Sequence, residues 1–171
     1  MLSIPGTAAR RLITVVAVAM SAFHLYVGFF GPPDAYVIRG THLAFALALA
    51  FLVMPGWRGT GTRVGWIDLV LVAVAAAAAL YPGANLDYIQ NRMYYVDDPL
   101  PLDYVFGGAL VLVVLEATRR ATGWALPLTA VCFIAYGLTL GHQPVAAMLD
   151  QAYLTTEGIF GIPLYVSATY V

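Results

Sequence analysis

Long apolar runs, each closed by glycine, proline or arginine, constrain the fold of this chain more than any other feature. Five runs follow one another along the sequence, at residues 12–30, 38–54, 64–80, 103–118 and 123–140. A helix needs about 20 apolar residues to cross roughly 30 Å of hydrocarbon. The pattern therefore predicts an all-α integral membrane protein, a bundle of about four transmembrane helices with a linking fifth helix.

The composition favours the same class. Hydrophobic residues make up 61% of the chain and charged residues only 10%, whereas soluble domains carry about 25% charged residues. Every basic residue is an arginine, and the arginines form no clustered basic face of the kind that binds nucleic acid. The single cysteine, Cys132, lies inside an apolar run, which predicts a small buried side chain and no disulfide or metal site.

The arginines are distributed unevenly between the two predicted sides of the membrane. Six lie in the amino-terminal tail or after the second and fourth runs, and two, Arg39 and Arg92, lie on the opposite side. Because arginine-rich loops stay in the cytoplasm, this bias predicts a cytoplasmic amino terminus. The aromatic residues agree, since all three tryptophans belong to the arginine-rich side and many tyrosines to the other.

The first run shares features with a secretory signal peptide. Arg10 and Arg11 precede it, and "AVA" at residues 17–19 resembles a cleavage site. The apolar run nevertheless continues well past that point, to Phe30. We therefore expect an uncleaved membrane anchor.

Charged residues at the arginine-rich ends of the predicted helices are candidates for assembly. Glu116 precedes Arg119 and Arg120 by three and four positions, so a helix places its carboxylate beside both guanidinium groups. Asp68 lies one turn into the third run, where the helix dipole favours an acid, and it could meet Arg63 or Arg119 across helices. We interpret these residues as a structural joint, with an intramembrane ion relay as the functional alternative.

The longest connection, residues 81–103, is acidic and is predicted to face the outside. It carries Asp87, Asp97 and Asp98, and its stretch "LDYIQNRMYYV" predicts a short helix along the membrane surface. An acidic outer surface suits the docking of a partner protein, and a solvated connector explains the same composition. Both interpretations stay open at this point.

His24 and His42 raise the question of a haem site. Both lie in the outer halves of neighbouring runs, and two imidazoles on facing helices can ligate a haem iron. A b-type electron carrier is therefore one alternative function, beside a purely structural membrane subunit; a histidine bonded to its neighbour is the plainer interpretation. The sequence has no nucleophile–base arrangement and predicts no strand, so we do not expect an enzyme.

Four stretches carry a resemblance to a known family: "RGTHLAFALALAFLVMP", "LVVLEATRRATGWALPL", "AYGLTLG" and "LTTEGIFGIPLYVSATYV". With them the chain resembles the tripartite ATP-independent periplasmic (TRAP) transporters. It is most similar to the fused permeases that work with the TAXI type of binding protein. The resemblance covers nearly the whole chain, and "LEATRR" and "TTEGIFGIPL" are its most specific parts.

The resemblance implies three parts. Residues 1–120 match the four-helix small subunit, 121–152 a linking transmembrane helix with an outer connector, and 153–171 the beginning of the large subunit. In this family of the bacterial inner membrane, a periplasmic solute-binding protein delivers small organic solutes such as carboxylates. A sodium gradient then drives an elevator-like motion of the large subunit against a fixed small-subunit scaffold. His42, Glu116, Arg119 and Arg120 match scaffold motifs and are expected to have structural roles.

The resemblance also implies what this chain lacks. The family holds substrate and sodium in large-subunit hairpins, which would follow the matched region. The last apolar run begins near Gly158 and reaches the final residue, so we expect the front of a longer protein. We accordingly expect no substrate, cofactor or metal site here, and expect the remainder of the large subunit and membrane lipids as partners. The connector "GHQPVAAMLDQ" departs from the family pattern.

Overall fold

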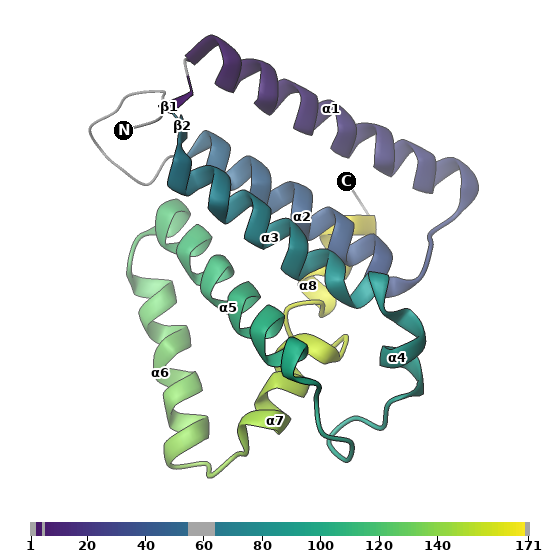
Figure 1. Cartoon of the computed structure of the whole chain (residues 1–171), viewed down its shortest axis with the longest axis vertical. Coiled ribbons are helices and arrows are strands. Elements are labelled where there is room, and N and C mark those ends of the chain that lie inside the picture. Colours follow the sequence, from purple (N-terminus) through teal and green to yellow (C-terminus); the bar gives the residue numbers. More distant parts are fainter. Residues whose placement is uncertain (1–2, 5, 55–63, 170–171) are drawn as a thin grey trace.

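The computed structural model describes residues 3–4, 6–54 and 64–169, and most of them are helical (Figure 1). The elements, in chain order, are β1 (Ser3–Ile4), α1 (Gly6–Phe30), α2 (Ala35–Val53), β2 (Val64–Gly65), α3 (Trp66–Ala84), α4 (Leu86–Asn91), α5 (Pro101–Thr122), α6 (Ala125–Thr139), α7 (Val145–Leu149), the π-helix η1 (Asp150–Leu154) and α8 (Ile162–Thr169). The predicted all-α class is confirmed.

Within the described ranges, four helices are long and apolar enough to cross a membrane: α1, α2, α3 and α5. They correspond to the first four predicted runs and extend beyond most of the predicted boundaries. The fifth run forms α6, which has 15 residues. A straight helix of that length spans only about 22 Å, less than the hydrocarbon core. The molecule is therefore a membrane-embedded helical bundle with a shorter fifth helix.

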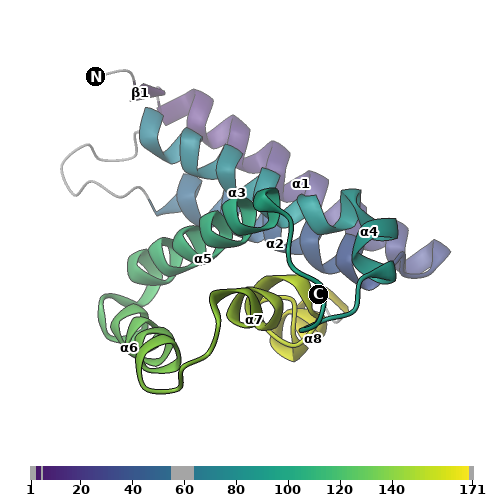
Figure 2. The ribbon, with the colours of Figure 1, turned by 60° about the horizontal axis from the view of Figure 1, so that its bottom comes forward.

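Each of the four long helices runs in the direction opposite to that of the long helix before it (Figure 1). Helices α2 and α3 pack against each other most extensively, α1 lies beside α2, and α5 packs on α3. Helix α6 leaves the end of α5 and diverges from the bundle, while α7, η1 and α8 lie against α2 and α5 (Figures 1 and 2). We call the end where α5 finishes the arginine end, and the end where α5 begins the tyrosine end.

Small residues allow α2 and α3 to approach closely. A Cβ atom added to Gly40 would lie 2.4 Å from the carbonyl oxygen of Ala79, so only glycine fits there. The opposing face of α3 presents Ala75, Ala78 and Ala79, which are fully buried. Helices in membranes pack through such small residues because lipid provides little hydrophobic drive for association. The alanine-rich run is thus the packing face of α3.

The third helix continues past the predicted stop at "YPG" and includes Pro82. Proline has no N–H group, so the carbonyl of residue 78 loses its usual helical donor. The hydroxyl of Tyr153, from η1, donates a hydrogen bond of 2.8 Å to that carbonyl of Ala78. A buried side chain from a distant segment therefore satisfies the group that proline leaves open, and the helix continues.

Two predictions about local structure are wrong. Strands do occur: Ser3 and Ile4 pair antiparallel with Gly65 and Val64, close to the start of α1 and α3. Cys132 is exposed on α6 rather than buried, because α6 turns most of its surface away from the other helices. Apolar sequence alone could not distinguish a side chain that faces the bundle from one that faces lipid.

Candidate functional site

At the arginine end, Glu116, Arg119 and Arg120 form the predicted joint. The guanidinium of Arg119 donates Nε and Nη2 to the two oxygens of Glu116, at 2.7 and 2.8 Å. Arg120 donates Nε to the same carboxylate at 2.8 Å. The helical spacing of three and four residues therefore produces the expected pairs.

Arg120 also links α5 to two other helices. Its Nη1 donates to Asp68 of α3 at 2.7 Å and to the carbonyl oxygen of Met54, at the end of α2, at 3.0 Å. Its guanidinium lies 4.8 Å from the ring centroid of Phe51. The predicted partners of Asp68 were Arg63 and Arg119; the structure pairs it with Arg120 instead, and Arg63 lies outside the described residues.

We call Asp68, Glu116, Arg119 and Arg120 the arginine clamp. The side chains of Arg120 and Asp68 are only 6% and 8% exposed, whereas those of Arg119 and Glu116 are 29% and 28% exposed. Two cations and two anions balance, so the clamp places no net charge at the membrane boundary. An unpaired charge there would cost free energy. The geometry is that of a neutral joint between α3 and α5.

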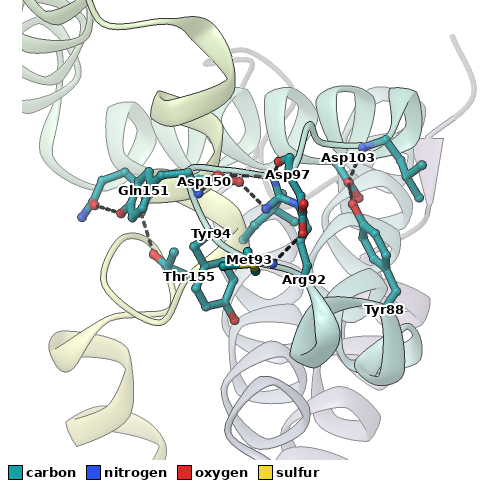
Figure 3. A network of polar contacts seen from close by, with 12 residues as sticks. Tyr88, Arg92, Met93, Tyr94, Asp97, Asp103, Asp150, Gln151 and Thr155 are labelled. Carbon is teal, nitrogen blue, oxygen red and sulfur yellow. Dashed lines mark hydrogen bonds and ion pairs between the residues drawn. The ribbon is translucent and has the colours of Figure 1, made fainter.

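At the tyrosine end, a second buried ion pair joins the long connection to η1 (Figure 3). Arg92 donates Nη1 to Asp150 at 2.5 Å, and these side chains are 2% and 1% exposed. Asp150 also accepts from Arg92 Nη2 at 3.2 Å and from the backbone N–H of Tyr95 at 2.8 Å. Arg92 donates further to the carbonyl of Asp97. The charges of Arg92 and Asp150 are thus compensated inside the fold.

Asp103, in the first turn of α5, is fully buried beside this pair (Figure 3). It accepts hydrogen bonds from the hydroxyls of Tyr81 and Tyr88, at 3.0 and 2.7 Å, and from the N–H of Leu100 at 2.7 Å. Burial raises the pKa of Tyr88, and the hydrogen bond to Asp103 raises it further. We call Tyr81, Tyr88, Arg92, Asp103 and Asp150 the tyrosine-end network.

The three acids predicted to dock a partner all lie in the connection that this network anchors. Asp87, Asp97 and Asp98 are exposed. Asp97 accepts a hydrogen bond of 2.7 Å from the N–H of Met93, so it also stabilises the loop. The predicted surface helix is shorter than expected and ends at Asn91. The connection is therefore anchored to the rest of the fold, while the side chains of Asp87, Asp97 and Asp98 are exposed.

His24 and His42 do come together, but not as ligands of a shared iron. Nε2 of His24 lies 2.9 Å from Nδ1 of His42, and Nδ1 of His24 lies 2.8 Å from the carbonyl oxygen of Met20. Since a carbonyl only accepts, His24 carries its proton on Nδ1, and in the neutral pair His42 donates to His24. The direct bond between the rings leaves no space between them for a haem iron.

Sequence reasoning missed Arg92, Asp103 and Asp150 as structural residues. Each is a charged residue that composition alone assigns to an exposed connection. The sequence did contain two indications of a structural role: Arg92 is the only basic residue of an acidic loop, and Asp150 follows the short apolar stretch "PVAAML". Their pairing across 58 positions has no local pattern that could reveal it.

No family model, curated protein or solved structure matches this chain. Among the described residues, no group of three or more histidine, cysteine or acidic side chains could hold a metal ion. The polar groups gather at the two ends of the bundle, where they connect helices. This arrangement can hold α2, α3 and α5 in fixed register, and it can present an acidic loop at the tyrosine end.

Proposed function

We propose that this chain is the scaffold part of a sodium-coupled permease of the TRAP type. In this proposal, it supports a moving transport domain and does not itself hold the solute. The sequence motifs that resemble the family motivate the proposal, and the described structure contributes one independent observation. That observation is the joining of α3 and α5 by the buried Arg120–Asp68 ion pair and of α2 and α3 by small-residue packing.

Rigidity is what a scaffold requires. Arg120 binds Asp68 across α3 and α5, and Gly40 lets α2 approach α3 without an intervening side chain. Opening either contact would expose an unpaired charge or separate packed backbones, and both changes are costly in lipid. A domain that slides through the membrane needs a neighbour of this kind that does not deform.

The proposal places the arginine end in the cytoplasm and the tyrosine end in the periplasm of a bacterial inner membrane. The arginine bias of the sequence supports this orientation. Asp87 and Asp98, exposed on an anchored loop, would then meet a periplasmic solute-binding protein that delivers small carboxylates. Charge complementarity at such a surface would raise the rate of docking more than its strength.

Photo-crosslinking in living cells tests this function. A photoreactive amino acid replaces Asp98 in one strain and Thr122, exposed at the arginine end, in a matched control. We expect an adduct with an extracytoplasmic solute-binding protein from position 98 only. We also expect deletion of the gene to abolish sodium-driven uptake of a carboxylate that the binding protein carries. Unchanged carboxylate uptake, or no such adduct, would refute the proposal.

A further inference from the structure

A cleft at the tyrosine end separates the last turns of α1 from α2 and α8. Its volume is about 560 Å³, and it is lined by Val27, Gly28, Gly31, Ile38, Arg39 and Ala168, among others. Gly28 has no atom within 4 Å of the place where its side chain would be, so the cleft is open there. The walls are mainly apolar, and Arg39 brings a full positive charge to them.

Arg39 has hydrogen-bonding capacity left over. Its Nη1 donates to the carbonyl of Phe160 at 2.6 Å, and its guanidinium lies 5.0 Å from the ring centroid of Tyr165. Its Nε is enclosed and has no acceptor within the described residues. No described carboxylate pairs with Arg39; the nearby Asp34 instead accepts from the N–H of Tyr36 and the amide of Gln90.

The other polar residues of the cleft are His24, Tyr165 and Thr169. Both ring nitrogens of His24 are already engaged, one with Met20 and one with His42, and Tyr165 and Thr169 contribute only neutral hydroxyls. The cation of Arg39 is therefore the group that an anion in this cleft would meet. Guanidinium groups bind oxyanions strongly because their planar donors match two oxygens at once.

The position of the cleft indicates which oxyanion it meets. Arg39 lies in the second turn of α2, and the loop residues Pro32 and Pro33 form the adjacent rim, so the cleft lies at the end of the membrane-crossing helices. Phospholipid phosphates lie just outside the hydrocarbon core, where membrane-crossing helices end. The outer face of α1 next to the cleft is strongly apolar, with Leu25 and Phe29 exposed, and would contact acyl chains.

We propose that this cleft binds the phosphate group of a membrane phospholipid, with Arg39 as its ligand. The glycerol and first methylene groups would pack on Val27 and Ile38. The bound lipid would fill the gap between α1 and the rest of the bundle at this end. This lipid-binding proposal does not depend on transport, so its test is independent of the function proposed above.

Native mass spectrometry of the delipidated full chain, titrated with dioleoyl phosphatidylglycerol, tests the site. Arg39→Gln removes the charge, and Gly28→Leu fills the cleft while leaving Arg39 in place. Arg10→Gln is the matched control, since Arg10 is exposed at the other end of α1. We expect Arg39→Gln to bind the lipid about tenfold more weakly, the effect of losing a charged hydrogen bond. We expect Gly28→Leu to weaken binding at least as much, because its side chain occupies the space of the lipid, and the control to bind like the original chain.

Inorganic phosphate in excess distinguishes a lipid site from a site for a free anion. We expect it to leave the bound phosphatidylglycerol in place, because it cannot replace the apolar contacts. Displacement by inorganic phosphate would overturn the lipid assignment. Unaltered lipid binding in either Arg39→Gln or Gly28→Leu would overturn the site itself.

Discussion

The arginine clamp and the tyrosine-end network both neutralise charge, but they connect different parts of the chain. In the clamp, three of the four residues lie within five positions on one helix, and one contact crosses to α3. In the network, Arg92 and Asp150 are 58 positions apart and join a surface connection to a segment beyond α6. The clamp therefore stabilises a helix pair, whereas the network determines where the later segments attach.

Burial also differs between the two. Glu116 and Arg119 are partly exposed, so solvent and headgroups screen their attraction. Arg92 and Asp150 are almost inaccessible, so each depends on the other for compensation. The more exposed pair was therefore the easier one to predict from the sequence, whereas removing one partner of the more buried pair is expected to cost more. Four experiments test the contacts at the two ends of the bundle.

The largest loss of stability is expected from Asp150→Ala. The variant leaves the buried cation of Arg92 with only a carbonyl acceptor, and breaking a buried pair in this way costs about 3–5 kcal/mol. Denaturant unfolding in detergent measures the change in the free energy of unfolding. Asp98→Ala, at an exposed position of the same loop, is the control and should stay within about 0.5 kcal/mol. Equal effects of the two changes would argue against the network.

Within the clamp, Arg120→Ala should cost more than Arg119→Ala. Arg120 is buried and has three acceptors, on Asp68, Glu116 and Met54, so its loss should cost about 2–3 kcal/mol. Arg119 is partly exposed and pairs along its own helix, so about 0–1 kcal/mol is expected. The same unfolding assay compares them. A reversed order would mean that the contact across helices is not what stabilises this end.

A double-mutant cycle tests the contact between η1 and α3. Tyr153→Phe should cost about 1–2 kcal/mol, because the carbonyl of Ala78 then has no donor. Pro82→Ala returns the backbone N–H to the helix, so the tyrosine change should cost less when made in that background. Strictly additive free energies would show that the hydroxyl does not compensate for Pro82.

The smallest effect concerns pH. The pKa of Tyr88 is raised by burial and by its bond to Asp103, above the ordinary value of 10.0. The resulting stabilisation is fully present below about pH 10 and is lost as the pH rises through the higher folded value. Thermal midpoints measured from about pH 9 to 11 should therefore fall more steeply for the original chain than for Tyr88→Phe. Parallel curves would contradict this role.

Some features of the fold could be predicted from the sequence and others could not, for physical reasons. Apolar runs of membrane-crossing length reveal α1, α2, α3 and α5, and the spacing of Glu116 and Arg119 reveals their pairing. Which arginine meets Asp68 depends on how α5 is rotated against α3, and local spacing does not specify that rotation. The exposure of Cys132 depends in the same way on the direction in which α6 leaves the bundle.

Accessibility from outside the cell tests most directly whether the two ends lie on opposite sides of a membrane. In a Cys132→Ala background, Asp98→Cys and Thr122→Cys each provide one thiol, at the tyrosine end and the arginine end respectively. An impermeant maleimide applied to intact cells should label position 98, and position 122 only after lysis. Labelling of position 122 without lysis, or protection of position 98, would contradict the account.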